Sequence, residues 1–411
     1  MNKLIRKYEY ETLRVGEKNF EKRHWNALIE LNEKHQSKYF EIVHKGVRFK
    51  QFVGIIQIGD LQIEILPKAD KHGTKNDWQK VLTQMLVETG YLHDYSLEKA
   101  NVNRQNLNLI HIYFELYLRQ VQKLIRLGLV KKYRQKSGNL KMFKGKPEFA
   151  RHIAENLIHK ERFYTTHQVY DTDHLLHQIL SVANKIVRRL SKGTHLSDFA
   201  NRIVMDFPEV ENIWVSPDTF DKIRLNRKTF AYEQALELAR LIILNYSPDI
   251  RSGQEQMLSL LFDMNELWEN FVFVRLKKYL RNMPEWQIKA QVSKKFVNGY
   301  TLRPDIYLEN TANGKKFIID TKWKQGNQHI DIADLRQVYV YGKYWNAEKV
   351  MLLYPGSHES SEYLTYENPT DYPKIKVKNG FVSILNDNHS LKNALGKEVF
   401  ELVLEENLIG V

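Results

Sequence analysis

Two acidic residues and a lysine toward the C-terminal end of the chain have the types and spacing that phosphodiester hydrolysis requires. Asp305 follows Pro304 in the segment TLRPDIYLE, and Asp320 and Lys322 lie near the end of the segment KKFIIDTKWK. Two carboxylates that converge from adjacent strands can hold a divalent metal ion through oxygen ligands, as Mg²⁺ prefers. A lysine beside them can position a water molecule and stabilise negative charge that develops at phosphorus.

Neighbouring strands must position these side chains. A strand places alternate side chains on one side, so Asp320 and Lys322 project together. The connection NTANGKK predicts a hairpin that brings the strand after Asp305 alongside. We predict a helix over residues 254–282, strands over 286–292, 302–309 and 316–322, a helix over 332–345 and a strand over KVMLLYP. This order is typical of a small α/β unit with helices on a mixed sheet.

The same residues resemble the signature of the PD-(D/E)XK nucleases, which reads here Pro304-Asp305 and then Asp320-Thr321-Lys322. In that superfamily a helical glutamate often supplies an additional metal ligand. In the preceding helix, MNELWENFVFVRL, Glu269 falls at the edge of the apolar stripe and Glu266 points further toward solvent. The resemblance therefore implies Glu269 as a third ligand. The alternative is an edge glutamate that reaches into solvent.

The helix after the Lys322 strand, DLRQVYVYGKYW, carries Gln337 and Tyr341 one turn apart on a single face. A Gln-x-x-x-Tyr pair at this place resembles the RecB-like members of the superfamily. That resemblance implies that Gln337 holds a DNA phosphate or the water of the metal. A packing face with one polar residue is the alternative.

A wider resemblance covers nearly the whole chain. The segments FVGIIQIGDLQIEILPK, FKGKPEFARHIAENLIHKERF, RPDIYL and IIDTKWK together resemble the McrC family, the nuclease subunits of McrBC and LlaJI-type restriction systems. The family pattern implies a C-terminal PD-(D/E)XK domain that cuts double-stranded DNA. It also implies an N-terminal region that docks on, and stimulates, an AAA+ GTPase partner similar to McrB.

The rest of the chain divides into two further regions. KYFEIVHKG, VRFKQFVGIIQIG and DLQIEILPK predict strands, with a tight turn at Gly59-Asp60 and a half-buried last strand in which Leu61 and Ile63 alternate with Gln62. Apolar periodicity predicts helices over residues 106–133, 174–189 and 232–244, with the loop KSGNLKMFKGKPEF after the first. The predicted fold is α+β and multidomain: a β-rich partner-docking module at 1–104, a mostly helical basic region at 105–250 and the α/β nuclease domain at 251–411.

Positive charge is concentrated in the middle of the chain. The net charge is +13, and residues 121–160 hold eleven Lys or Arg against two Glu. Such a block predicts contacts with a polyanion, because cations that bind phosphates release counterions. A solvated helix face followed by a basic loop is the alternative. The candidate DNA-binding residues are Lys131, Lys132, Arg134, Lys144, Lys146 and Arg151.

Several classes of protein are excluded by absent residues and motifs. The chain has no cysteine, so disulfides, thiolate zinc sites and cysteine nucleophiles are excluded. No apolar run suggests a signal peptide or a membrane span, and we expect a cytoplasmic protein. No G-x-x-x-x-G-K-[ST] or G-x-S-x-G motif occurs, so we expect no nucleotide site in this chain.

Three functional hypotheses follow. The first is a Mg²⁺-dependent endonuclease subunit, with Mn²⁺ as a possible substitute, that acts when bound to its GTPase partner. The second is an adaptor that activates an NTPase and keeps a vestigial nuclease site. The third is a stand-alone RecB-like nuclease, which would cut DNA without any partner.

Overall fold

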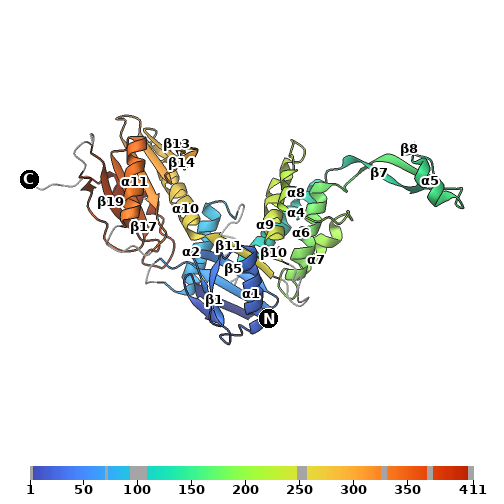
Figure 1. The fold of residues 1–411 in the computed structure, drawn as a ribbon, viewed down its shortest axis with the longest axis horizontal. Coiled ribbons are helices and arrows are strands. Elements are labelled where there is room, and N and C mark those ends of the chain that lie inside the picture. Colours follow the sequence, from blue (N-terminus) through green and yellow to red (C-terminus); the bar gives the residue numbers. More distant parts are fainter. Residues whose placement is uncertain are drawn as a thin grey trace, which may run out of the picture. The chain divides into compact units, whose positions relative to one another are not determined.

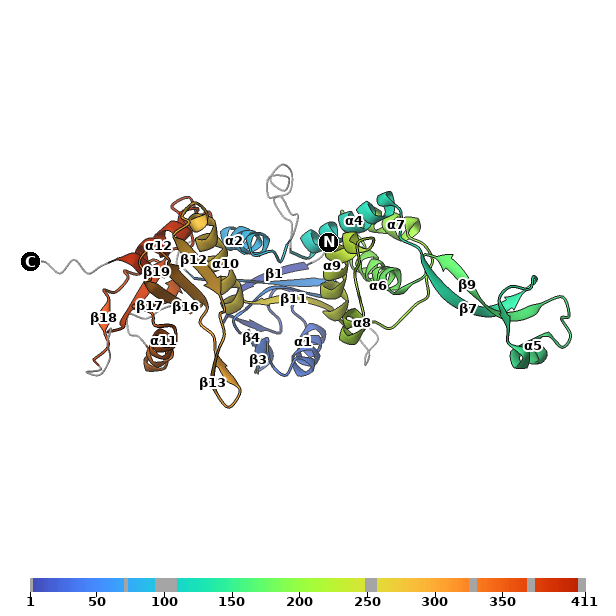
Figure 2. The same ribbon diagram turned by 90° about the horizontal axis from the view of Figure 1, so that it is seen from above.

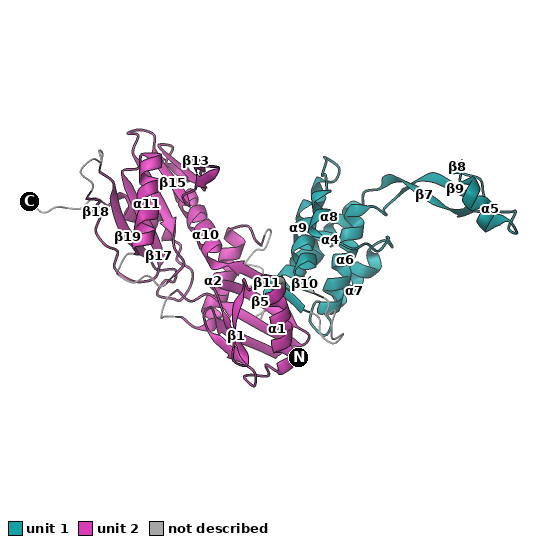
Figure 3. Ribbon diagram, viewed as in Figure 1, with its two compact units in different colours: residues 1, 105–260 teal, residues 2–104, 261–411 magenta. Residues whose placement is uncertain are grey.

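The computed structural model describes residues 3–69, 73–92, 109–247, 257–324, 331–367 and 374–405. Residues 105–260, with residue 1, form one compact unit, and residues 2–104 form a second unit together with 261–411 (Figure 3). We call these the smaller and the larger unit. The division differs from the three regions expected at 1–104, 105–250 and 251–411. Helix α10 (Met264–Tyr279) packs on helix α2 (Lys75–Glu88), and this contact joins the first and last of the three regions.

The N-terminal part of the larger unit contains two sheets. One has the strand order β1 (Lys3–Tyr8), β6 (Leu61–Leu66) and β5 (Phe52–Ile58), followed by β11 (Met257–Asp263), of which only residues 261–263 belong to this unit. The other has the order β2 (Thr12–Arg14), β4 (Gly46–Phe49) and β3 (Phe40–Val43), and helices α1 (Lys22–Lys34) and α2 (Lys75–Glu88) accompany them. The predicted hairpin is confirmed: Ile58 pairs with Leu61 across the turn, where Gly59 has a φ of 55°.

Strand β6 is not half-buried, as its alternating pattern predicted, because both of its faces are covered. Glu64 on the polar side is completely buried. Arg6 Nε donates to Glu64 Oε2 at 2.8 Å, and Gln79 Nε2 donates to Oε1 at 2.8 Å. These partners satisfy the carboxylate, so a strand that reads as amphipathic is stable inside the unit.

The C-terminal part of the larger unit is built on a six-stranded mixed sheet (Figures 1 and 2). The strands lie in the order β12 (Trp286–Ala290), β15 (Ile306–Asn310), β16 (Lys316–Thr321), β17 (Lys349–Pro355), β19 (Lys376–Val382) and β18 (Leu364–Thr365). Helix α11 (Ile332–Trp345) packs on the face that includes Ile318. On the opposite face, Trp286 contacts Phe317 and Phe400 of helix α12 (Leu395–Leu404). The predicted mixed sheet, the helix at 332–345 and the strand at 349–355 are confirmed.

Some elements of this part were not predicted. Residues 257–263, expected as helix, form strand β11, and helix α10 (Met264–Tyr279) starts only after Asp263, whose side chain accepts from the Asn265 N–H at 2.9 Å. The 3₁₀ turn η2 (Leu280–Asn282) ends it. The hairpin of β13 (Lys294–Val297) and β14 (Tyr300–Leu302), strand β19 and helix α12 were also missed.

The smaller unit has a helical core. Its helices are α4 (Leu109–Leu127), α6 (Leu175–Leu190), α7 (Ser197–Asp206), α8 (Pro217–Asp221), the 3₁₀ turn η1 (Phe230–Tyr232) and α9 (Glu233–Leu244), and β10 (Tyr246–Ser247) pairs with the first residues of β11. Tyr117 of α4 is fully buried and donates to Asn184 Oδ1 of α6 at 2.8 Å. Helix α4 ends at Leu127, before Gly128, and not at residue 133 as predicted; residues 106–108 lie outside the described residues.

A long β-ribbon extends from these helices (Figure 2). It consists of β7 (Lys132–Leu140), β9 (Phe163–Asp171) and the short β8 (Lys146–Pro147), with helix α5 (Phe149–Asn156) at its far end. The segment KSGNLKMFKGKPEF was predicted as a loop, and its first part instead belongs to β7. The ribbon was missed because backbone pairing, over nine residues of β7 and β9, stabilises it without an apolar pattern. None of the described helices is long and apolar enough to cross a membrane.

Candidate active site

Asp305, the residue before β15, lies opposite Asp320 of the adjacent antiparallel strand β16. Ile306 of β15 pairs with Ile319 of β16, and this register continued by one residue sets Asp305 against Asp320. Asp305 Oδ2 accepts two hydrogen bonds from Thr321, from the backbone N–H at 2.7 Å and from Oγ1 at 2.8 Å. The Asp305 carboxylate is therefore fixed in orientation by the strand that carries its partner.

Lys322 continues the line of β16 beyond its last residue, since its backbone N–H donates to Leu353 of β17 at 2.9 Å. Its Nζ lies 2.8 Å from Asp320 Oδ2, which confirms that the two side chains project on one side of the strand. The same ammonium lies 3.4 Å from Asp334 Oδ1 and donates to Gln337 Oε1 at 3.0 Å. The Lys322 ammonium is therefore held in place by Asp320, Asp334 and Gln337.

Burial dominates the electrostatics of the site. Asp320 is only 2% exposed. Burial, and then the charge of Asp305, raises the pKa of Asp320 to about 7, although Lys322 opposes both. Burial also raises the pKa of Asp305, against the hydrogen bonds from Thr321. Burial alone would lower the pKa of the Lys322 ammonium, but Asp320 and Asp334 outweigh it and the pKa is raised.

Glu269 of α10 faces the same site. Burial, followed by the charge of Asp305, raises the pKa of Glu269 to about 7. Gln291 Nε2 donates to Glu269 Oε1 at 2.7 Å and orients the carboxylate. Glu266, by contrast, is exposed and accepts from Tyr91 Oη at 3.3 Å. The helical-wheel argument that preferred Glu269 over Glu266 therefore agrees with their positions.

Helix α11 supplies the groups that hold Lys322. Gln337 Nε2 donates to Tyr341 Oη at 2.9 Å while Gln337 Oε1 accepts from Lys322, so Gln337 links the two residues. Asp334, one turn before Gln337, was not predicted. Burial would raise the pKa of Asp334, but Lys324 at 2.6 Å and Lys322 lower it. Its place three residues before Gln337 on one helix face was the available signal.

The donor atoms suit a hard divalent cation. Asp320 Oδ2 is buried and forms an ion pair with Lys322 Nζ, but no hydrogen bond to it is formed among the described residues. A cation between Asp305 and Asp320 would offset the burial that raises the pKa of both carboxyls, and the charge of Asp305 that raises the pKa of Asp320 further. Within the described residues no three acidic or histidine side chains form a ready metal cluster. Mg²⁺ requires only one or two carboxylates and completes its shell with water.

The predicted DNA-binding residues all lie in the smaller unit, on or beside the ribbon. Lys132 is opposite Asp171 of β9, whereas Lys146 is opposite Thr166. Five residues of a strand span about 17 Å, so the ribbon separates the group around Lys132 from the group around Lys146. These groups are Lys131, Lys132 and Arg134 at the base, and Lys144, Lys146 and Arg151 near α5.

Two of these cations are engaged within the ribbon. Arg134 lies 3.0 Å from Asp171 and 2.9 Å from Asp173, so its charge is offset by two carboxylates. Arg151 Nη1 donates to Tyr164 Oη at 2.9 Å. The four lysines are the members of the set that remain available to a polyanion, and the structure does not bring all six residues into one patch.

Comparisons with known proteins match most of the chain. The family model described as McrBC 5-methylcytosine restriction system component matches residues 47–355. A chain of the refined half-complex from a tetradecameric assembly of Thermococcus gammatolerans McrB AAA+ hexamers with bound McrC is similar in fold, with a TM-score of 0.70 and 17% identity; the match covers 97% of this chain and 100% of that one. A chain of the Thermococcus gammatolerans McrBC complex has a TM-score of 0.51 and 20% identity over 67% of this chain and 88% of that one. No curated protein sequence matches the chain.

Proposed function

The chain belongs to the McrBC 5-methylcytosine restriction system component family, and from this membership and the site we propose that it is the DNA-cleaving subunit of such a system. The observation that carries the proposal is that Asp305, just before β15, lies opposite Asp320 of β16 when the strand register is extended by one residue, with Lys322 Nζ 2.8 Å from Asp320. Carboxylates on two strands beside a cation are the parts that phosphodiester hydrolysis needs.

In the proposed reaction Asp305 and Asp320 hold Mg²⁺, for which Mn²⁺ can substitute, and Glu269 is the candidate third ligand. When bound, Mg²⁺ supplies positive charge to the scissile phosphate and favours ionisation of a water molecule. Thr321 keeps Asp305 in the orientation for ligation through its two hydrogen bonds. Lys322, held by Asp334 and Gln337, stabilises the negative charge that develops on the phosphate or positions the attacking water.

We further propose an AAA+ GTPase partner, as in the McrB complexes of Thermococcus gammatolerans to which the fold is similar. The far end of the ribbon supports a protein contact. Three apolar side chains of α5 and its C-cap recur every four residues and are exposed, Phe149 by 70%, Ile153 by 61% and Leu157 by 73%. An exposed apolar helix face of this kind is typical of an interaction surface. The chain thus has two candidate docking surfaces for the GTPase: the module at residues 1–104 and the far end of the ribbon.

The experiment is DNA cleavage in Mg²⁺ by the wild-type chain and by Asp320→Ala, each with and without the GTPase partner and GTP. We expect cutting only by wild type, and only with partner and nucleotide. Cutting without the partner would identify a stand-alone nuclease. Stimulated GTP hydrolysis with no cutting would identify an activating adaptor, and equal loss of both activities in Asp320→Ala would withdraw the site assignment.

A further inference from the structure

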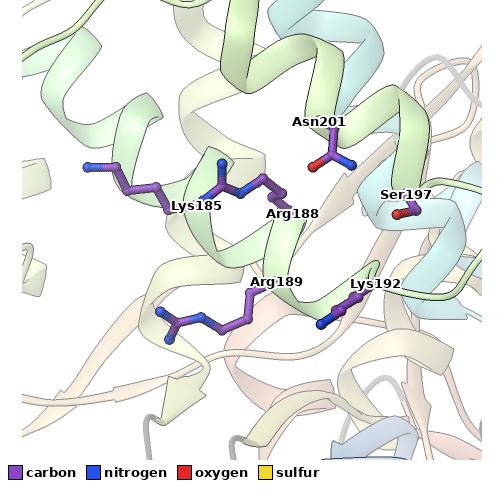
Figure 4. A pocket seen from close by; sticks show the side chains of 6 residues that line it. All are labelled: Lys185, Arg188, Arg189, Lys192, Ser197 and Asn201. Atoms are coloured by element: carbon purple, nitrogen blue, oxygen red, sulfur yellow. The ribbon is translucent and has the colours of Figure 1, made fainter.

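A second concentration of positive charge lies away from the ribbon, on the helices of the smaller unit. A cavity of about 430 Å³ is lined by Lys185, Arg188, Arg189, Lys192, Ser197 and Asn201 (Figure 4). The four cations come from α6 and the turn that follows it, and Ser197 and Asn201 come from α7. We call this cavity the α6–α7 groove. Its lining contains no carboxylate and no apolar side chain.

The cations form one row. Lys185 lies three and four positions before Arg188 and Arg189, so these three share one side of α6, and Lys192 follows just after the helix ends. Like charges at this spacing repel one another and destabilise a helix. The four residues make no ion pair within the described part of the chain. Lys185 donates to Asn212 Oδ1, and Arg189 Nη1 donates to Tyr246 Oη at 3.2 Å, so both of these acceptors are neutral.

The helix dipole explains only part of this arrangement. Arg188 and Arg189 lie in the last turn of α6, where cations are favoured by the negative end of the dipole. Lys185 lies a turn earlier, outside the range of that effect. Across the groove, Ser197 is the first residue of α7, whose positive end is partly offset by Asp198 in the same turn. The groove therefore gathers positive potential beyond what the stability of α6 requires.

We infer that the α6–α7 groove binds the phosphates of a nucleic-acid backbone. Lys, Arg, Ser and Asn are side chains that proteins use for phosphate contacts. The row from Lys185 to Lys192 spans about 10 Å, the length of duplex axis over which one DNA strand advances by about three phosphates. Five of the six lining residues are exposed, all but Ser197. A small ligand would instead need an enclosing and mostly apolar pocket.

This inference does not depend on the proposed cleavage, because binding is measured without metal. The full chain, in EDTA, is titrated against a short fluorescein-labelled DNA duplex between about 0.05 and 0.3 M salt. Arg188→Gln/Lys192→Gln is compared with the matched control Lys222→Gln/Lys228→Gln, which removes two exposed lysines of the same unit. Circular dichroism of each variant checks that the fold is retained.

We expect the groove variant to lose about 30-fold in affinity at 0.15 M salt and its salt slope to fall by about 2, since each phosphate contact contributes about 0.9 to that slope. The control should change far less. Equal losses of DNA affinity in both variants would overturn the inference, because the groove cations would then act only through the overall charge of the protein. A groove variant with normal DNA affinity overturns it too. Lost stabilisation by GTP would then assign the groove to a free nucleotide, and lost assembly with the GTPase would assign it to a protein.

Discussion

Trp323 and Glu9, which are 314 residues apart, are joined by hydrogen bonds inside the larger unit: Trp323 Nε1 donates to Glu9 Oε1 at 2.8 Å and lies 3.0 Å from Oε2. Glu9 follows β1 and also accepts from the backbone N–H of Lys68 at 3.0 Å. Trp323 comes directly after Lys322, and its ring contacts Trp268 with centroids 5.7 Å apart. The N-terminal part of the unit therefore holds the segment that carries the candidate catalytic residues.

Replacing the donor tests this link. In Trp323→Phe the ring remains but the N–H is lost, and the buried Glu9 carboxylate keeps only its bond from Lys68. We expect the free energy of unfolding to fall by about 1–3 kcal/mol, measured by urea denaturation. The control is Trp214→Phe, because Trp214 is 83% exposed. Equal effects of the two substitutions would mean that the link contributes nothing.

Glu9 should also make stability depend on pH. Burial raises the pKa of Glu9 to about 7, well above its unfolded value near 4.5. Between these values the folded protein keeps a proton that the unfolded chain has lost, so the contribution of Glu9 to stability is complete at low pH and declines as pH rises from about 4.5 to 7. The total decline is on the order of 3 kcal/mol. The free energy of unfolding is measured for wild type and for Glu9→Gln across this range. As pH rises, wild type should lose that amount of stability relative to the variant. A constant difference between the two contradicts the prediction.

The sequence predicted which candidate residues lie together better than it predicted the contacts around them. Asp305, Asp320 and Lys322 were identified because the P-D and D-x-K motifs are short. Alternation along a strand then determines on which side of the sheet each side chain lies. Glu9 and Trp323 were not paired, since a contact between residues so far apart leaves no periodic signal in one sequence. Asp334 was missed for a different reason: an acidic residue in the first turn of a helix is ordinary for its dipole.

The fold, too, was predicted only where a local sequence pattern indicates a helix or a strand. Helix α11 was predicted at its observed bounds because apolar residues recur with the helical period of 3.6 along its whole length. The ribbon of β7 and β9 was missed because KYRQKSGNL has no apolar alternation. Strand β11 was read as helix because a buried strand and a buried helix segment both appear as a short apolar run.

Metal binding can be measured without activity. If Asp305 and Asp320 hold Mg²⁺, then a concentration about 100 times the Kd should stabilise the folded protein by about 2.7 kcal/mol. Asp305→Asn/Asp320→Asn should lose this stabilisation and at least about 100-fold in cleavage rate. The amide oxygen that this change introduces at position 305 would still accept from Thr321, so the variant should fold. Thermal melting with Mg²⁺ and with EDTA provides the readout, and a melting shift retained in the double variant would place the ion elsewhere.

Gln337 should matter more to cleavage than Tyr341. Gln337→Leu removes the acceptor that holds Lys322 Nζ, whereas Tyr341→Phe removes only the hydroxyl on the far side of Gln337. We expect kcat to fall by about 10- to 100-fold in Gln337→Leu and by a few-fold at most in Tyr341→Phe, since a mispositioned catalytic group costs up to about 100-fold. Single-turnover cleavage rates decide the order. If both variants cleave at the wild-type rate, Lys322 is positioned by Asp320 and Asp334 alone.

The end of the ribbon should determine partner binding. Phe149 and Ile153 project from α5 on one face and contact little of their own unit, so their replacement by serine should not destabilise the fold. Buried apolar anchors at interfaces contribute about 2 kcal/mol each, and Phe149→Ser/Ile153→Ser should therefore weaken the GTPase complex by at least about 100-fold. Met205→Ser is the control, because Met205 on α7 is an apolar side chain of the same unit that is even more exposed, at 84%. Isothermal titration against the GTPase measures the affinity. Both substitutions should leave DNA binding in EDTA unchanged, since neither alters charge. A full-strength complex in the ribbon variant would return docking to residues 1–104, where the resemblance first placed it.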